Sequence, residues 1–178
     1  MTENNGITNL LVEVNLPEDF VEFTDKTFPT GLRIVKESAE NFCIIVQTGV
    51  KAPADVVWEK WNNPDDVIGW NFASDDWCCP KAENDLRIGG KFSYRMEAKD
   101  GSGGFDFGGV YRIIAINQFI EYIMADGRIV KIYFEYDNNH TNITITFSPE
   151  NINSFDLQRY GWQSILNNFK KYVEAEKS

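Results

Sequence analysis

The sequence predicts a single α+β domain in which an antiparallel sheet packs against a long C-terminal helix. Strand-like alternation recurs between residues 91 and 147, and turn-forming residues separate the alternating segments. An apolar stripe with helical spacing then runs through residues 154–175. The 178 residues, of which 43% are hydrophobic and 25% charged, are enough for one soluble globular domain with a full core.

The first regular element expected is a strand over residues 42–50. Alternate positions along it would share one face: Phe42, Ile44, Val46, Thr48 and Val50. A helix should follow from Pro53, because proline suits the first turn and Asp55 complements the helix dipole. Its apolar stripe consists of Val57, Trp58 and Trp61. Asn63–Pro64 is expected to end this helix.

Residues 64–89 are expected to form a short helical turn and a loop that holds Trp70, Phe72 and Trp77. Gly89–Gly90 then marks the entry into a strand over residues 91–97. Three side chains are expected on the inner face of that strand: Phe92, Tyr94 and Met96.

A meander of antiparallel strands is predicted next. Asp100–Gly104 has the composition of a hairpin turn and leads into a long strand over residues 105–116. Further strands are predicted over residues 119–124, 129–136 and 141–147. In the last two, apolar residues alternate with polar ones such as Asn142, Thr144 and Thr146, which predicts that one face of the sheet is solvated.

The closing helix, residues 154–175, must bury its apolar stripe on the sheet. The stripe consists of Trp162, Ile165, Leu166, Phe169 and Val173. Gly161 lies inside this helix, although glycine costs roughly 1 kcal/mol relative to alanine at such a position. We therefore expect Gly161 to mark a close approach of another backbone.

Residues 1–40 are interpreted as an acidic extension that precedes one domain over residues 41–178. Eight acidic and three basic side chains give the extension a net charge of −5, half of the total of −10. Loose alternation at residues 10–16 and an apolar run at residues 32–35 predict one or two weak strands within it.

The excess of 27 acidic over 17 basic residues disfavours binding to nucleic acids and to anionic membranes, because such a surface repels phosphate groups. The first 30 residues lack the pattern of a signal peptide, and no apolar stretch approaches the roughly 20 residues of a membrane span. These features predict a cytoplasmic protein. Its three cysteines, Cys43, Cys78 and Cys79, are then expected to be reduced thiols.

No residue pattern predicts a catalytic site, a metal site or a cofactor. The one histidine, His140, lies in a turn-like segment where a solvated side chain is expected. Cys78–Cys79 lacks the paired spacing of a zinc site and is expected to pack beside Trp77. Asp100–Gly104 lacks the Lys and Ser/Thr that follow a phosphate-binding loop.

The aromatic content is more informative, because five Trp, seven Tyr and 13 Phe exceed what a small two-layer core usually needs. An aromatic-lined pocket for a small molecule would use this surplus. A filled core fits the same residues, and the periodicity alone favours that alternative.

A series of motifs stands in order between residues 50 and 173. They are Lys51–Trp58 (KAPADVVW), Trp70, Asp85–Phe92 (DLRIGGKF), Tyr94–Met96 (YRM), Phe107–Tyr111 (FGGVY), Asp126–Arg128 (DGR), Thr146–Phe147 and Gly161–Trp162. With these motifs the chain resembles the activator-of-heat-shock-protein-90-ATPase homologue group (AHSA-like) of the START-like, or SRPBCC, superfamily. Residues 1–40 have no counterpart in this pattern.

The resemblance implies a helix-grip fold, in which a curved antiparallel sheet wraps around the long C-terminal helix and leaves an apolar cavity. Matching positions imply that the cavity is lined by Trp58, Trp70, Phe92, Tyr94, Met96, Phe107, Tyr111, Phe134, Phe147, Trp162 and Phe169. They also imply that Arg128 is a polar anchor for a carboxylate or carbonyl. Each of these residues could equally belong to an ordinary core, and Arg128 could instead pair with an acid at a strand start.

The resemblance implies less about function, since relatives include lipid and other hydrophobic-ligand carriers, polyketide-type cyclases and a domain of the eukaryotic chaperone activator. A non-enzymatic protein that binds a small hydrophobic molecule is our leading hypothesis. The first alternative is a co-chaperone-like module whose partner is a chaperone. The second is a cyclase or hydratase-type enzyme that uses Tyr94, Tyr111 or Arg128 to polarise a carbonyl. The ligand's identity and the oligomeric state stay open.

Overall fold

The structure is a computed structural model that describes residues 2–4, 7–9 and 43–175. The chain forms two compact units, Met1–Glu37 and Ser38–Ser178. In the first unit, β1 (Thr2–Asn4) pairs antiparallel with β2 (Ile7–Asn9). The strands expected within residues 10–16 and 32–35, and the predicted strand position Phe42, lie outside the described residues.

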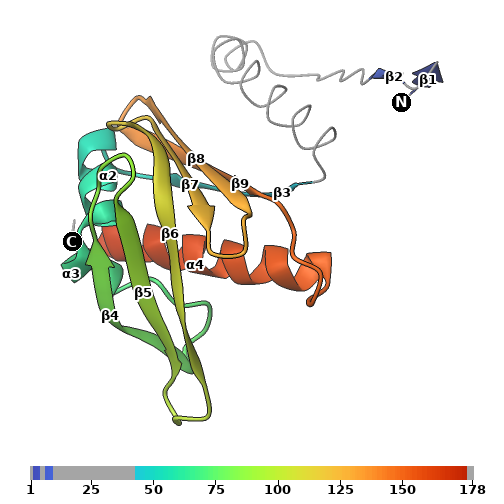
Figure 1. Ribbon diagram of the computed structural model, residues 1–178. Helices are drawn as coiled ribbons and strands as arrows, with labels where there is room; N and C mark the ends of the chain where they lie inside the picture. Colours follow the sequence, from blue (N-terminus) through green and yellow to red (C-terminus); the bar gives the residue numbers. More distant parts are fainter. Residues whose placement is uncertain (1, 5–6, 10–42, 176–178) are drawn as a thin grey trace. The chain divides into compact units, whose positions relative to one another are not determined.

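The second unit is built on one seven-stranded antiparallel sheet that curls around a long helix (Figure 1). The strands, in chain order, are β3 (Ile44–Val50), β4 (Trp77–Asn84), β5 (Lys91–Ala98), β6 (Gly104–Ala115), β7 (Phe119–Met124), β8 (Ile129–Asp137) and β9 (His140–Phe147). Their order across the sheet is β3-β9-β8-β7-β6-β5-β4. The helix α4 (Phe155–Ala175) lies across the concave face, so the predicted α+β helix-grip arrangement is confirmed.

The predicted meander is confirmed strand by strand from β5 to β9. Each strand pairs antiparallel with the next one in the chain, as short turns require. The three side chains expected on the inner face of β5 are all buried: Phe92, Tyr94 and Met96.

The prediction of a loop over residues 64–89 is wrong in its second half, because β4 forms there. This strand pairs with β5 at the free edge of the sheet, and its register shifts between Cys78 and Lys81. Pro80 lies in the irregular stretch, where an edge strand tolerates a residue without an N–H donor. The irregular register and the exposed edge leave no clean alternation of apolar residues that the sequence could reveal.

The prediction that the polar residues of β9 are solvated also needs correction, because Thr144 and Thr146 are buried. In the sheet, Thr144 lies between Gln47 of β3 and Tyr133 of β8. Larger side chains on both neighbouring strands cover a small threonine. A polar residue on an outward position of a central strand can therefore be buried by its own sheet.

Two helices precede β4, and the Asn63–Pro64 pair separates them as predicted. The first helix, α2 (Ala54–Asn62), buries Val57 and Trp58. Asn63 then caps the short helix α3 (Pro64–Val67), because its side-chain oxygen accepts a hydrogen bond from the Asp65 backbone N–H at 3.2 Å. The same pair of residues thus ends one helix and begins the next.

The outer edge of β3 is covered by side chains of α4. Gln163 Nε2 donates to the backbone carbonyl of Gln47 at 3.0 Å, and its Oε1 accepts from the Gln47 N–H at 3.3 Å. Further along, the Lys51 N–H donates to Glu174 Oε1 at 2.9 Å. These contacts satisfy backbone groups that an exposed edge strand would offer to another chain.

The carboxylate of Asp66 joins the three helices of the domain. Its Oδ1 accepts from Tyr172 Oη of α4 at 2.8 Å and from Lys60 Nζ of α2 at 3.1 Å. Its Oδ2 accepts from Asn63 Nδ2 at 2.8 Å. Charge-assisted hydrogen bonds are among the stronger ones, and Asp66 is largely buried, so this cluster fixes the C-terminal half of α4 against α2 and α3.

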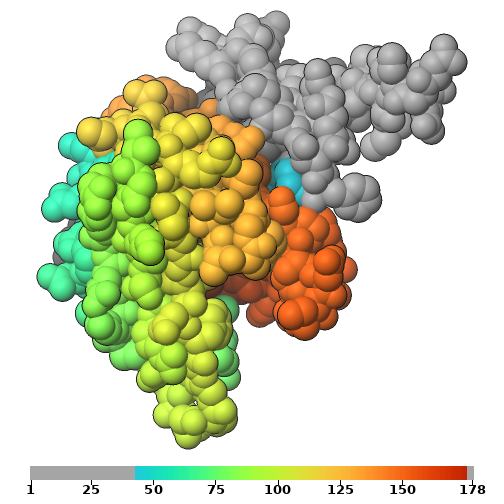
Figure 2. Space-filling model, in the orientation of Figure 1, coloured from blue at the N-terminus to red at the C-terminus, as the bar shows by residue number. Residues whose placement is uncertain are grey.

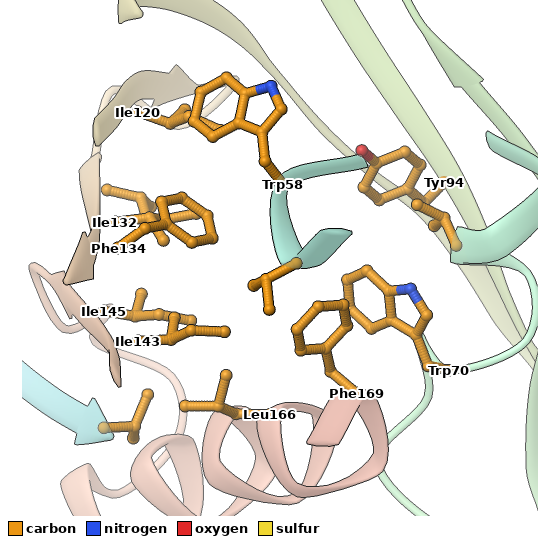
Figure 3. Close-up of a cluster of buried hydrophobic side chains, with 14 of the residues drawn as sticks. Trp58, Trp70, Tyr94, Ile120, Ile132, Phe134, Ile143, Ile145, Leu166 and Phe169 are labelled. Carbon is orange, nitrogen blue, oxygen red and sulfur yellow. The ribbon is translucent and has the colours of Figure 1, made fainter. Parts of the chain in front are cut away.

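The two halves of α4 differ in burial. Leu166, Phe169 and Val173 in the C-terminal half are fully buried in the core shown in Figure 3. In the N-terminal half, Phe155 is 45% and Tyr160 71% exposed. The helix is therefore packed firmly at its end and loosely at its beginning.

A Tyr172→Phe substitution should lower the free energy of unfolding by about 1–2 kcal/mol, because the buried Asp66 carboxylate loses a donor. Urea unfolding of the two proteins measures this difference. Tyr160→Phe is the matched control, since it makes the same change on an exposed face of the same helix. Equal losses in both variants would contradict the role given to the Asp66 cluster.

Candidate functional site

The aromatic residues predicted to line a cavity come from the sheet, from α2 and α4, and from the turn after α3, which holds Trp70. Nine of the predicted apolar lining residues are buried: Trp58, Trp70, Phe92, Tyr94, Met96, Tyr111, Phe134, Phe147 and Phe169. The remaining two, Phe107 and Trp162, are only partly buried. The ring contacts divide the aromatic residues into two clusters.

The first cluster fills the space between α2 and the C-terminal half of α4 (Figure 3). The Trp58 and Phe134 rings meet edge to face at 5.4 Å between centroids, and Trp70 and Phe169 do so at 4.9 Å. Trp61 lies between them, 4.9 Å from Trp70 and 4.8 Å from Phe169. Close ring contacts on all sides are typical of a filled core.

The second cluster lies beneath the N-terminal half of α4 and centres on Phe92. Its ring is 5.0 Å from Tyr94, 5.3 Å from Tyr111, 4.8 Å from Tyr122 and 5.9 Å from Phe107. Tyr122 was not among the predicted lining residues. Its alternation with Ile120 in a predicted strand is the signal that could have revealed it.

The second cluster reaches α4 through Phe107 and Trp162. The Phe107 ring is 5.7 Å from Trp162, and Trp162 stacks on Phe147 at 4.1 Å. Gly109 makes room for the Tyr122 and Phe92 rings, because a Cβ there would lie 3.0 Å from the Tyr122 ring and 3.1 Å from the Phe92 ring. A glycine in this strand thus allows the aromatic rings to approach the sheet closely.

Gly161 faces open space, so the expectation of a close backbone approach is wrong. A Cβ on this residue would meet no other atom of the described chain within 4 Å. Two helical turns further on, Asn168 donates from the same side of α4 to the Phe72 carbonyl at 2.8 Å. The open space therefore lies on the side of the helix that faces the segment before β4, next to the partly buried Trp162.

A polar group of tyrosines and asparagines borders the second cluster. The Tyr111 hydroxyl donates to Asn84 Oδ1 at 2.9 Å. Burial raises the pKa of Tyr111 to about 12, although hydrogen bonds with Tyr94 and Asn84 act in the opposite direction. Burial also raises the pKa of Tyr94 and of Tyr122 well above the ordinary value. These phenols stay protonated at neutral pH.

Arg128 lies in the turn between β7 and β8, where it pairs with Asp126. Its Nε is 2.8 Å from Asp126 Oδ2, and its Nη1 donates to the Ser148 carbonyl at 3.4 Å. The Arg128 side chain is 19% exposed. The sequence left two roles open for Arg128, a ligand anchor or an ion pair with an acid at a strand start. The structure shows the ion pair, with Asp126 just before β8.

Comparison with known families gives a match over residues 51–174 to the family described as Activator of Hsp90 ATPase homolog 1-like protein. The chain belongs to this family. A solved AHSA1-like protein from Aeromonas hydrophila is 38% identical, with a TM-score of 0.72 over 76% of this chain and 94% of that one. The protein Chr148 from Cytophaga hutchinsonii is 47% identical, with a TM-score of 0.66 over 75% and 92%. No curated protein matches the chain.

This AHSA1-like domain shares its fold with more distant proteins as well. NE0264 from Nitrosomonas europaea is 16% identical and has a TM-score of 0.65 over 76% of this chain and 96% of that one. At such low identity the likeness concerns the fold alone. The resemblance to the AHSA-like group and to the START-like, or SRPBCC, fold is thus confirmed.

The remaining reactive side chains considered from the sequence are one histidine and three thiols. His140 is exposed at the start of β9, and Cys43, Cys78 and Cys79 are free thiols. Burial raises the pKa of Cys79, so this thiol stays protonated and is a poor nucleophile at neutral pH. Among residues 43–175 and the two N-terminal strands, no helix is long and apolar enough to span a membrane.

The buried phenols of this AHSA1-like domain should make its stability fall at alkaline pH. The pKa of Tyr111 is about 12 in the folded chain and roughly 10 in an unfolded chain. Below pH 10 both states hold the proton; between pH 10 and 12 only the unfolded state releases it, so the free energy of unfolding decreases. Tyr111→Phe should show a shallower decrease than the wild type in urea unfolding from pH 9 to 12. Identical slopes would contradict the burial of this hydroxyl.

Proposed function

We propose that this AHSA1-like domain binds a small hydrophobic molecule between the N-terminal half of α4 and the sheet. One observation carries the proposal: space is open at Gly161, beside the partly buried rings of Trp162 and Phe107. Apolar and aromatic walls with few polar groups are typical of sites for small hydrophobic ligands. The firmly packed first cluster holds the helix in place while the second cluster receives the ligand.

Lipids and aromatic polyketides are the ligand classes that suit such walls. The tyrosine hydroxyls of the second cluster are uncharged, since burial keeps Tyr94, Tyr111 and Tyr122 protonated. A raised pKa makes a phenol a weaker proton donor toward a carbonyl, which argues for a carrier and against a cyclase or hydratase-type enzyme. Arg128 stays a candidate anchor for a ligand carbonyl only if its ion pair with Asp126 opens. A cytoplasmic location remains a prediction of the sequence.

Binding to a chaperone is the second candidate function, and an exposed apolar surface at the start of α4 favours it. The side chains in question are Ile152, Leu157 and Tyr160, which are 92%, 57% and 71% exposed. Exposed apolar residues gathered at one place are typical of protein interaction sites. A pull-down with the cell's own Hsp90-type chaperone that yields no stoichiometric complex and no change in ATP turnover would exclude this function.

Native mass spectrometry tests the proposed ligand site. The freshly purified protein should carry a discrete lipid or metabolite mass that is lost after denaturation and delipidation. Gly161→Leu should lose this mass, because its side chain fills the open space, and should unfold at a free energy equal to or about 1 kcal/mol above that of the wild type. Delipidated wild type should in turn be stabilised by a fatty acid, a sterol or an aromatic polyketide.

Lys171→Leu is the control, because it places the same side chain on an exposed position of the same helix. This variant should keep the bound mass. If Gly161→Leu keeps the mass as well, the ligand site lies elsewhere. An apo spectrum of the wild type, with no stabilisation by any compound of the panel, would refute the carrier function.

A further inference from the structure

A run of partly buried hydrogen bonds leads from the sheet to the end of α2. Tyr94 and Tyr111 are joined by a hydrogen bond between their hydroxyls, and Tyr111 donates in turn to Asn84 Oδ1 at 2.9 Å. Asn84 Nδ2 donates to the backbone carbonyl of Asn62 at 2.6 Å. The Asn84 amide therefore links the tyrosines of the sheet to the last residue of α2.

The run ends at the backbone carbonyl of Asn62, and the side chain of the same residue holds an acceptor that lacks a donor. Its Nδ2 donates to the Trp58 carbonyl at 2.8 Å, and this contact decides which atom of the carboxamide is the oxygen. Asn62 is only 7% exposed, and within the described part of the chain its Oδ1 is buried without a hydrogen-bond partner. A buried acceptor in this state has lost its hydrogen bonds with water without forming one in the protein, which destabilises the folded state.

Asn62 is connected to the second aromatic cluster through Asn84, which accepts from the Tyr111 hydroxyl and donates to the Asn62 carbonyl. The Phe92 ring contacts Tyr94, Tyr111 and Phe107, and Phe107 in turn contacts Trp162 of α4. Figure 3 shows the Tyr94 hydroxyl pointing from β5 toward α2. A continuous series of rings therefore leads from the open space at Gly161 to the polar run that Asn62 ends.

We propose that Asn62 Oδ1 accepts a hydrogen bond from a hydroxyl group of the bound hydrophobic molecule. This inference rests on the proposed function and narrows its ligand class to apolar molecules that carry a neutral hydroxyl. The hydroxyl supplies the donor that the buried acceptor lacks. A carboxylate does not suit this position, because at neutral pH it brings a second acceptor and no proton.

Three probes of equal chain length test the inference on the delipidated wild-type protein: dodecanol, methyl undecyl ether and dodecanoate. Tryptophan fluorescence titrations give their dissociation constants. Dodecanol should bind about tenfold more tightly than the ether, which has the same number of heavy atoms and no O–H donor, and more tightly than dodecanoate. Equal affinities for alcohol and ether would overturn the inference while leaving the carrier function intact. Failure of all three probes would overturn the inference, and the native mass spectra described above would then decide the carrier function separately.

An Asn62→Leu variant removes the acceptor and should lower the affinity for dodecanol about tenfold, to that of the ether, without changing the affinity for the ether. Asn71→Leu is the matched control, since Asn71 is also a buried asparagine and its Nδ2 contacts the Met96 sulfur at 3.5 Å. The control should keep the preference for the alcohol. If Asn62→Leu fails to fold, the comparison of the alcohol with the ether on the wild-type protein still tests the inference. A crystal structure of the dodecanol complex with an ordered water on Oδ1 would overturn the inference.

Discussion

The Asp66 carboxylate is the contact on which the arrangement of the helices depends. It receives hydrogen bonds from α2, from the residue that separates α2 and α3, and from Tyr172 near the end of α4. A largely buried carboxylate must have such partners, because an unpaired buried charge is very unfavourable. The three helices are therefore fixed relative to one another at this point, and the C-terminal half of α4 is held where Leu166 and Phe169 enter the core.

The N-terminal half of α4 is less deeply buried than the C-terminal half and lies next to the second aromatic cluster. The first aromatic cluster, around Trp61 and Trp70, is filled and stabilises the fold, while the second, around Phe92, reaches partly exposed rings and the open space at Gly161. This division of the concave face explains how one set of aromatic residues supports both a stable core and the site proposed for a ligand. Gln163 and Glu174 meanwhile keep α4 attached to the edge of the sheet.

Much of the fold could be predicted from the sequence, because the strands from β5 to β9 alternate cleanly and short turns join them. The edge strand β4 could not, since Pro80 and the register shift after Cys78 erase its alternation. The family pattern named eleven apolar positions as a lining, and nine of them are buried. The sequence does not show which of these residues belong to the filled cluster, because contacts between distant segments decide this. The open space at Gly161 depends on such contacts as well. The unpaired oxygen of Asn62 likewise follows only from the three-dimensional structure.

Amide hydrogen exchange along α4 tests the central claim most directly, namely that this helix is firmly held at its end and loosely packed at its beginning. The account predicts that amides of residues 160–163 exchange at least about tenfold faster than those of residues 167–171, because they open locally while the latter open only with the core. Uniform protection along the whole helix would contradict it.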